Sequence, residues 1–220
     1  MTLRLIVFDV DGTLVDSQRQ IAAAYTAGFA AIDRPAPRLA EVRSVIGLSL
    51  PLAFTRLAPD ATPGEVERGI LAYRRAFSAG PEAPLFPGIA EMLRRLGSRP
   101  TTLLRIATGK SRRGVDRLLA HHALEGLFQT VQTADLHPSK PHPAMLTAAL
   151  DAVGVTPEHA VIVGDATFDV EMGRAAGIGA LGVAWGYHPA AALHGAGAIG
   201  VAEDVAALEA MLGAGEMAVA

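Results

Sequence analysis

The most constraining feature of this chain is a short apolar segment near its start that runs directly into two carboxylates. Residues 5–8 (Leu-Ile-Val-Phe) favour a strand that is buried on both faces. Alternate side chains of an extended segment point the same way, so Asp9 and Asp11 can converge where this strand ends. Carboxylates at the edge of an apolar core need a cation or a proton, and Gly12 allows a sharp turn there. The pattern predicts a metal-assisted site with one ionised and one proton-shuttling acid. The alternative is a strand-to-turn junction in which both acids are simply solvated.

Composition limits the classes of protein that this chain can belong to. Its 220 residues suffice for one α/β domain with a smaller insert, and half of them are apolar. A net charge of −3 without a basic cluster argues against a nucleic-acid partner. The absence of cysteine excludes disulfides, thiolate catalysis and cysteine-ligated zinc, and fits a cytoplasmic protein. Because Asp9 and Asp11 interrupt the first apolar segment and the later ones are also interrupted, we expect neither export nor a membrane partner.

A run of predicted helices follows the first strand. Apolar residues recur at helical spacing in this part of the chain, and nothing between residues 17 and 80 favours a strand. The Pro/Gly-rich segment 80–88 is the best candidate for the connection that returns to the sheet. We therefore expect a helical cap over residues 16–82. The predicted helices span residues 17–32, 39–46, 50–57 and 63–79.

The rest of the chain alternates between helix and strand. This alternation predicts an α/β fold with a doubly wound parallel sheet, formed by residues 1–15 and 83–220, into which the α-helical cap is inserted. The predicted strands after the first are 103–107, 128–133, 160–163 and 180–184. The predicted helices between and after them are 88–97, 111–122, 141–153, 167–176 and 203–212. The glycine-rich segment 195–200 matches a dinucleotide-binding pattern in letters, but we expect no further strand after it.

Polar side chains gather at the predicted strand ends. A doubly wound sheet places its site at the carboxyl ends of its strands, so several such junctions argue more strongly than one. They are Asp9 and Asp11 after the first strand, Thr108, Gly109 and Lys110 after the second, Lys140 before a helix, and Asp165 and Asp169 after residues 160–163.

These residues resemble the four motifs of the haloacid dehalogenase-like (HAD) phosphatases, most closely the phosphoglycolate phosphatase-like branch with a helical cap after the first strand. Residues 9–17 (Asp-Val-Asp-Gly-Thr-Leu-Val-Asp-Ser) resemble the first motif, and residues 164–169 (Gly-Asp-Ala-Thr-Phe-Asp) the fourth. Thr108 stands at the second motif and Lys140 at the third. The resemblance covers essentially the whole chain.

The resemblance implies a role for each of these residues. Asp9 would attack phosphorus and form an aspartyl-phosphate, and Asp11 would protonate the leaving oxygen and then activate water. Mg²⁺ would bind Asp9, the backbone carbonyl of Asp11 and Asp165. Asp169 would hold the outer shell of the metal or pair with Lys140. The phosphoryl oxygens would be bound by Thr108, the Gly109 amide and Lys140.

The substrate stays open at this level, although the resemblance implies a small phosphorylated metabolite such as phosphoglycolate. Gly109 stands where many relatives have Asn, which removes a side chain but leaves the amide donor. Residues 47–48 resemble the cap loop that faces the site, and Arg19 or Arg43 are candidates for a substrate carboxylate, although an exposed helical arginine is the commoner case. A phosphosugar mutase and a non-catalytic binding protein are the alternatives. Monomer and homodimer are both compatible with the sequence.

Overall fold

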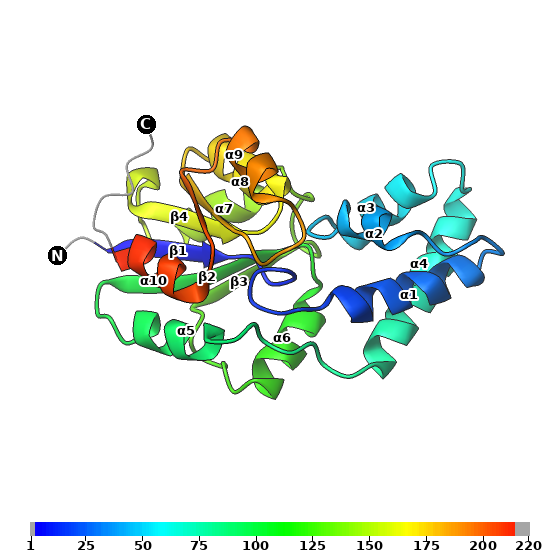
Figure 1. The fold of residues 1–220 in the computed structure, drawn as a ribbon, viewed down its shortest axis with the longest axis horizontal. Coiled ribbons are helices and arrows are strands. Elements are labelled where there is room, and N and C mark those ends of the chain that lie inside the picture. The colour runs from blue at the N-terminus through cyan, green and yellow to red at the C-terminus, as the bar shows by residue number, and fades with distance from the viewer. Residues whose placement is uncertain (1–2, 214–220) are drawn as a thin grey trace.

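The computed structural model describes residues 3–213 and has a layered α/β core with a lobe of helices at one end (Figure 1). Six strands form one parallel sheet in the order β3-β2-β1-β4-β5-β6. From β1 the sheet grows in both directions, so the predicted doubly wound arrangement is confirmed. The strands are β1 (Arg4–Phe8), β2 (Thr102–Thr108), β3 (Thr130–Thr133), β4 (Ala160–Gly164), β5 (Gly179–Val183) and β6 (Gly200–Ala202).

Helices cover both faces of this sheet, which is why its central strands are apolar throughout. Along β1, Leu5 and Val7 join the hydrophobic cluster on one face, and Ile6 and Phe8 join the cluster on the other. Full burial of side chains of this size contributes roughly 1.5–3 kcal/mol each. The first face is covered by α7 (Ala144–Asp151), α8 (Thr167–Ala175) and α9 (Ala190–Ala196), and the second by α5 (Ile89–Gly97), α6 (Arg112–His121) and α10 (Val205–Gly213) (Figure 1).

The remaining helices form the lobe at the carboxyl end of the sheet (Figure 1). They lie between β1 and α5 in the chain and share a hydrophobic cluster that includes Tyr25, Phe29 and Phe54. Gly69 lets two of these helices approach closely, because a Cβ there would lie 2.2 Å from Phe54 Cζ. The helices are α1 (Gln18–Ala30), α2 (Leu39–Arg43), α3 (Leu50–Leu57) and α4 (Pro63–Ala79). No helix within residues 3–213 is long and apolar enough to cross a membrane.

Two adjacent chain segments connect the lobe to the core. The Asp16 amide donates to the Pro84 carbonyl at 2.9 Å, and Val15 bridges to Leu85. The two connections between the lobe and the core therefore lie side by side. We retain residues 16–82 as the proposed extent of the cap.

The expectation that no strand follows residues 195–200 is wrong. Strand β6 begins at Gly200 and pairs with β5 at the edge of the sheet, after helix α9, which the sequence also did not indicate. Helix α9 contains one buried large apolar residue, Leu193, so it has no apolar periodicity. Strand β6 has three residues, which is too short for a sequence pattern. Its pairing with β5 is what makes this segment a strand.

Candidate active site

The candidate site lies where the direction of strand order reverses, at the carboxyl ends of β1 and β4. The two strands are neighbours, and the Asp9 amide donates to the Val163 carbonyl at 2.9 Å. Asp9 directly follows β1, and Asp165 directly follows β4. A crevice at this switch point is the usual ligand site of a doubly wound sheet. The fold therefore brings together two aspartates that are far apart in the sequence.

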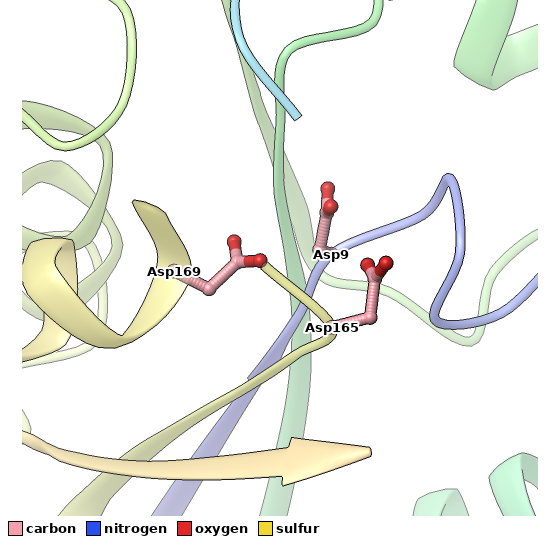
Figure 2. Close-up of side chains that lie close together, drawn as sticks. All are labelled: Asp9, Asp165 and Asp169. Carbon is pink, nitrogen blue, oxygen red and sulfur yellow. The ribbon is translucent and has the colours of Figure 1, made fainter. Parts of the chain in front are cut away.

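Three aspartates form the centre of the site. Asp9, Asp165 and Asp169 each offer a carboxylate oxygen, and these oxygens lie within 4.8 Å of one another (Figure 2). All three residues are buried. Burial penalises the charged form and raises the pKa of Asp9 to about 7 and that of Asp165 well above its usual range. Three carboxylates in this position require positive charge nearby.

Lys140 supplies part of that charge. Its side chain is fully buried, and Nζ lies 2.8 Å from Asp9 Oδ1 and 2.7 Å from Asp169 Oδ1. Burial alone would lower the pKa of Lys140, but the charges of Asp169 and Asp9 raise it above its usual range. Asp169 is held in place by a second contact, because its Oδ2 accepts a hydrogen bond from the Ala166 amide at 3.1 Å. One ammonium against three carboxylates leaves the cluster short of positive charge.

The remaining charge and donor atoms fit a hard divalent cation. Among the described residues, Asp9 Oδ2 is a buried oxygen without a hydrogen-bond partner. The side chain of Asp165 is closely enclosed, since a Cβ at Gly12 would lie 2.2 Å from its Oδ2 and a Cβ at Gly186 would lie 2.6 Å from the same oxygen. Oxygen ligands from carboxylates are those that Mg²⁺ prefers. The carboxylate oxygens present here are thus of the kind expected for the metal site that the sequence predicts around Asp9 and Asp165.

Asp11 is not part of this cluster, although the alternation of an extended segment would have placed it beside Asp9. Strand β1 ends at Phe8, and the chain turns at Gly12, whose φ of 85° favours glycine. The Asp11 carboxylate accepts hydrogen bonds from Lys110 Nζ at 2.9 and 3.0 Å. Asp9 therefore pairs with Lys140 and Asp11 pairs with Lys110, and only Asp9 belongs to the acidic cluster.

The loop after β2 approaches the cap. Thr108 is buried at the end of the strand, and its Oγ1 accepts a weak hydrogen bond from the Lys110 amide at 3.3 Å. A Cβ at Gly109 would lie 2.4 Å from the Leu48 carbonyl oxygen and 2.6 Å from that of Gly47. This close approach explains the glycine, because an asparagine here would displace the cap loop. The Ser49 amide also donates to Ser139 Oγ at 2.8 Å, so the cap loop contacts the core at two places.

A cavity of about 350 Å³ lies between the cap and the core. Asp11, Gly109 and Lys110 line it from the core, and α1, the loop before α3, and α4 line it from the cap. Arg19 and Arg43 are exposed and do not line it. Arg43 instead donates to the Gln18 side chain. The acid Asp11 lines the cavity, whereas the nucleophile candidate Asp9 is fully buried and does not line it.

The sequence motifs do not indicate three contacts of the site. Thr13 Oγ1 donates to Asp165 Oδ1 at 3.1 Å, and the Tyr187 amide donates to Asp165 Oδ2 at 2.9 Å. The third is the pairing of Lys110 with Asp11. Thr13 and Lys110 stand inside recognisable motifs, so a role for them could have been suspected. Tyr187 follows β5 in an irregular loop, and only the fold brings it to Asp165.

The raised pKa of Asp9 makes the stability of the metal-free protein depend on pH. Its unfolded-state value is near 3.8 and its folded-state value about 7, so the folded protein holds this proton more tightly. The contribution is present below about pH 4 and is lost as the pH rises through 7. We expect the melting temperature in EDTA to fall between pH 5 and pH 8, and to fall less in Asp9→Asn. An equal fall in both proteins would contradict this assignment.

Comparisons with known proteins place this chain in a family. The model of the family described as haloacid dehalogenase-like hydrolase matches residues 6–183. A Dickeya dadantii protein described as "Probable phosphatase IndB" is 36% identical over 201 residues, covering 87% of this chain and 86% of its own. A phosphoglycolate phosphatase of Pseudomonas putida is 31% identical over 193 residues, covering 84% and 71%. A hydrolase structure from Pseudomonas syringae superposes with a TM-score of 0.86 at 26% identity, covering 97% and 98%.

The fold and site define an α/β enzyme whose acidic centre lies under a helical cap. The chain belongs to the haloacid dehalogenase-like hydrolase family, in its phosphoglycolate phosphatase-like branch. The resemblance seen in the sequence is thereby confirmed, and so is the assignment to phosphatase-type enzymes.

Proposed function

We propose that this enzyme hydrolyses small phosphomonoesters with Mg²⁺ and that the phosphoryl group passes through Asp9. The observation that carries the proposal is the buried Asp9 carboxylate, held by Lys140 at 2.8 Å and adjacent to Asp165. A phosphate dianion brought to three carboxylates would be repelled unless cations offset them. Lys140 and a divalent cation together would supply that compensation.

The proposed reaction has two steps. In the first, an Asp9 carboxylate oxygen attacks phosphorus, the ester P–O bond breaks, and Asp11 gives its proton to the leaving alkoxide. In the second, Asp11 takes a proton from water as that water attacks the phosphorus of the aspartyl-phosphate. The P–O bond to Asp9 then breaks, which releases phosphate and restores the carboxylate. The net change is one ester and one water converted into an alcohol and phosphate.

The other site residues hold the phosphoryl group during both steps. Thr108 at the end of β2 and the Gly109 amide after it would offer donors, and Lys140 would offer its buried ammonium. Asp9, Asp165 and the Asp11 carbonyl would bind Mg²⁺, with Asp169 orienting Lys140. The bound ion would supply a Lewis acid that withdraws charge from the phosphoryl oxygens. The cap loop at residues 47–49 would exclude bulk water.

The direct test is release of inorganic phosphate from a panel of phosphomonoesters, including phosphoglycolate, glycerol phosphate and sugar phosphates. We expect release to require Mg²⁺ and to fall by at least about 10²-fold in EDTA, because a metal ion supplies several kcal/mol of charge stabilisation. No release from any ester would contradict the proposal. Interconversion of a sugar 1-phosphate and 6-phosphate without release would favour the mutase alternative.

Metal binding is measurable without turnover. A ligand that binds only the folded state stabilises it by about 2.7 kcal/mol at a concentration of 100 times its Kd. We expect Mg²⁺ to raise the melting temperature of the wild type, and to raise it much less in Asp165→Asn. The exposed Asp151→Asn serves as a matched control and should respond like the wild type. An equal shift in all three proteins would place the ion elsewhere.

A further inference from the structure

The size and lining of the cavity under the cap indicate what kind of alcohol the substrate contains. It opens on Asp11, the group that would protonate the leaving oxygen, so the proposed function places the leaving group inside it. Its volume of about 350 Å³ falls within the roughly 300–1,000 Å³ that drug-sized ligands occupy. A two-carbon acid such as glycolate would leave most of this space unfilled.

Aromatic side chains form the cap side of the cavity. Tyr25 and Tyr73 meet edge to face with ring centroids 4.8 Å apart, and Tyr73 stacks on Phe77 at 5.9 Å with an interplanar angle of 10°. Aliphatic side chains from α1 and from the loop before α3 complete this wall, among them Ile46 and Leu48. Such a wall gains free energy by covering an apolar ring, and it solvates a carboxylate poorly.

Two of the cations around the cavity are already paired with carboxylates, and the other two lie at its exposed side. Within the described residues, four cations line it. Lys110 Nζ lies 2.9 Å from Asp11 Oδ1 and 4.6 Å from the centre of the Phe77 ring. Arg117 pairs with Glu82. The other two, Arg74 and Arg113, are exposed.

We propose that the preferred substrates are phosphomonoesters of alcohols that carry an aromatic or heteroaromatic ring, rather than of short acids such as glycolate. The inference rests on the proposed function, because Asp11 must act at the leaving oxygen for the cavity to hold the leaving group. The ring would lie against Tyr73 and Phe77, with its ester oxygen toward Asp11. The exposed arginines would face the outer end of the substrate.

Benzyl phosphate and ethyl phosphate form a suitable pair for the test. Both are esters of primary alcohols, so they differ mainly in the ring. We expect kcat/KM for benzyl phosphate to exceed that for ethyl phosphate by about 10- to 100-fold, mostly through KM, and to exceed that for phosphoglycolate too. A ratio near one, or a preference for phosphoglycolate, would overturn the inference while leaving the phosphatase function intact.

Two variants locate the ring. Phe77→Ala removes part of the proposed wall, and we expect it to reduce the benzyl-to-ethyl ratio by about tenfold. Phe86→Ala removes an equally half-buried phenylalanine of the core that does not line the cavity, and its ratio should match the wild type. An undiminished ratio in Phe77→Ala would show that the ring binds elsewhere and would overturn the proposed placement.

Binding of the two phosphonates decides the same question if no ester is hydrolysed. Benzylphosphonate and ethylphosphonate, titrated calorimetrically in the presence of Mg²⁺, should differ in Kd by about tenfold or more in favour of the ring. Equal affinities would contradict the ring preference. Failure of turnover together with a clear difference in Kd would contradict the proposed function and support the recognition of the ring.

Discussion

Asp9→Asn should lower kcat by at least about 10⁴-fold, because Asn lacks the carboxylate that we propose as the nucleophile. Phosphate release and mass spectrometry of acid-quenched protein measure the two consequences, loss of turnover and loss of the phosphorylated protein. The exposed Asp33→Asn is a matched control, since it makes the same chemical change on the surface of the cap and should leave activity unchanged. Substantial turnover by Asp9→Asn would rule out Asp9 as the nucleophile.

The same substitution should stabilise the metal-free protein. Asp9 is fully buried, and burial and the charge of Asp169 both oppose its ionisation. An asparagine removes that penalty while Lys140 keeps its partner Asp169. We therefore expect a higher melting temperature in EDTA at pH 8 for Asp9→Asn, together with its loss of activity. Opposite effects on stability and activity are typical of a residue retained for catalysis.

Lys140→Met should have the largest effect on stability. It removes the buried cation between Asp9 and Asp169 and leaves two carboxylates without their partner. Breaking a buried ion pair on one side costs about 3–5 kcal/mol, and we expect that loss in the free energy of unfolding measured with urea in EDTA. A loss below about 1 kcal/mol would contradict the described charge balance. The exposed Arg75→Met is the control and should change stability by less than about 0.5 kcal/mol.

A second substitution separates stability from catalysis in this variant. Asp169→Asn, added to Lys140→Met, removes one of the two uncompensated carboxylates and should recover part of the lost free energy of unfolding. It should not recover activity, because the ammonium that we propose to offset charge on the phosphoryl group is still absent. We expect kcat to stay about 10²–10³-fold below the wild type in both proteins. Recovery of activity in the double variant would mean that Lys140 acts only through stability.

Much of the fold could be predicted because its signals are local. The apolar run at residues 5–8, the helical spacing in α4 and the Pro/Gly-rich return segment each reflect a preference of the residues themselves. The start of helix α4 is one example of such a local signal, because Thr62 Oγ1 accepts a hydrogen bond from the Glu65 amide there. Helix α9 and strand β6 escaped prediction because their order comes from packing and pairing at the sheet edge.

The sequence by itself determined the class of the protein and the chemical types at its centre. Carboxylates after buried strands, a lysine before a helix and a helical insert are local patterns that predict a capped, metal-assisted site, and their resemblance to the HAD motifs implies phosphate chemistry. Only the tertiary structure decided which groups meet. The chain turns at Gly12, and Asp11 pairs with Lys110 instead of joining the acidic cluster. The absence of a side chain at Gly109 lets the cap loop approach closely. The aromatic cavity likewise depends on how α1 and α4 pack over the core, a long-range arrangement that no local pattern encodes.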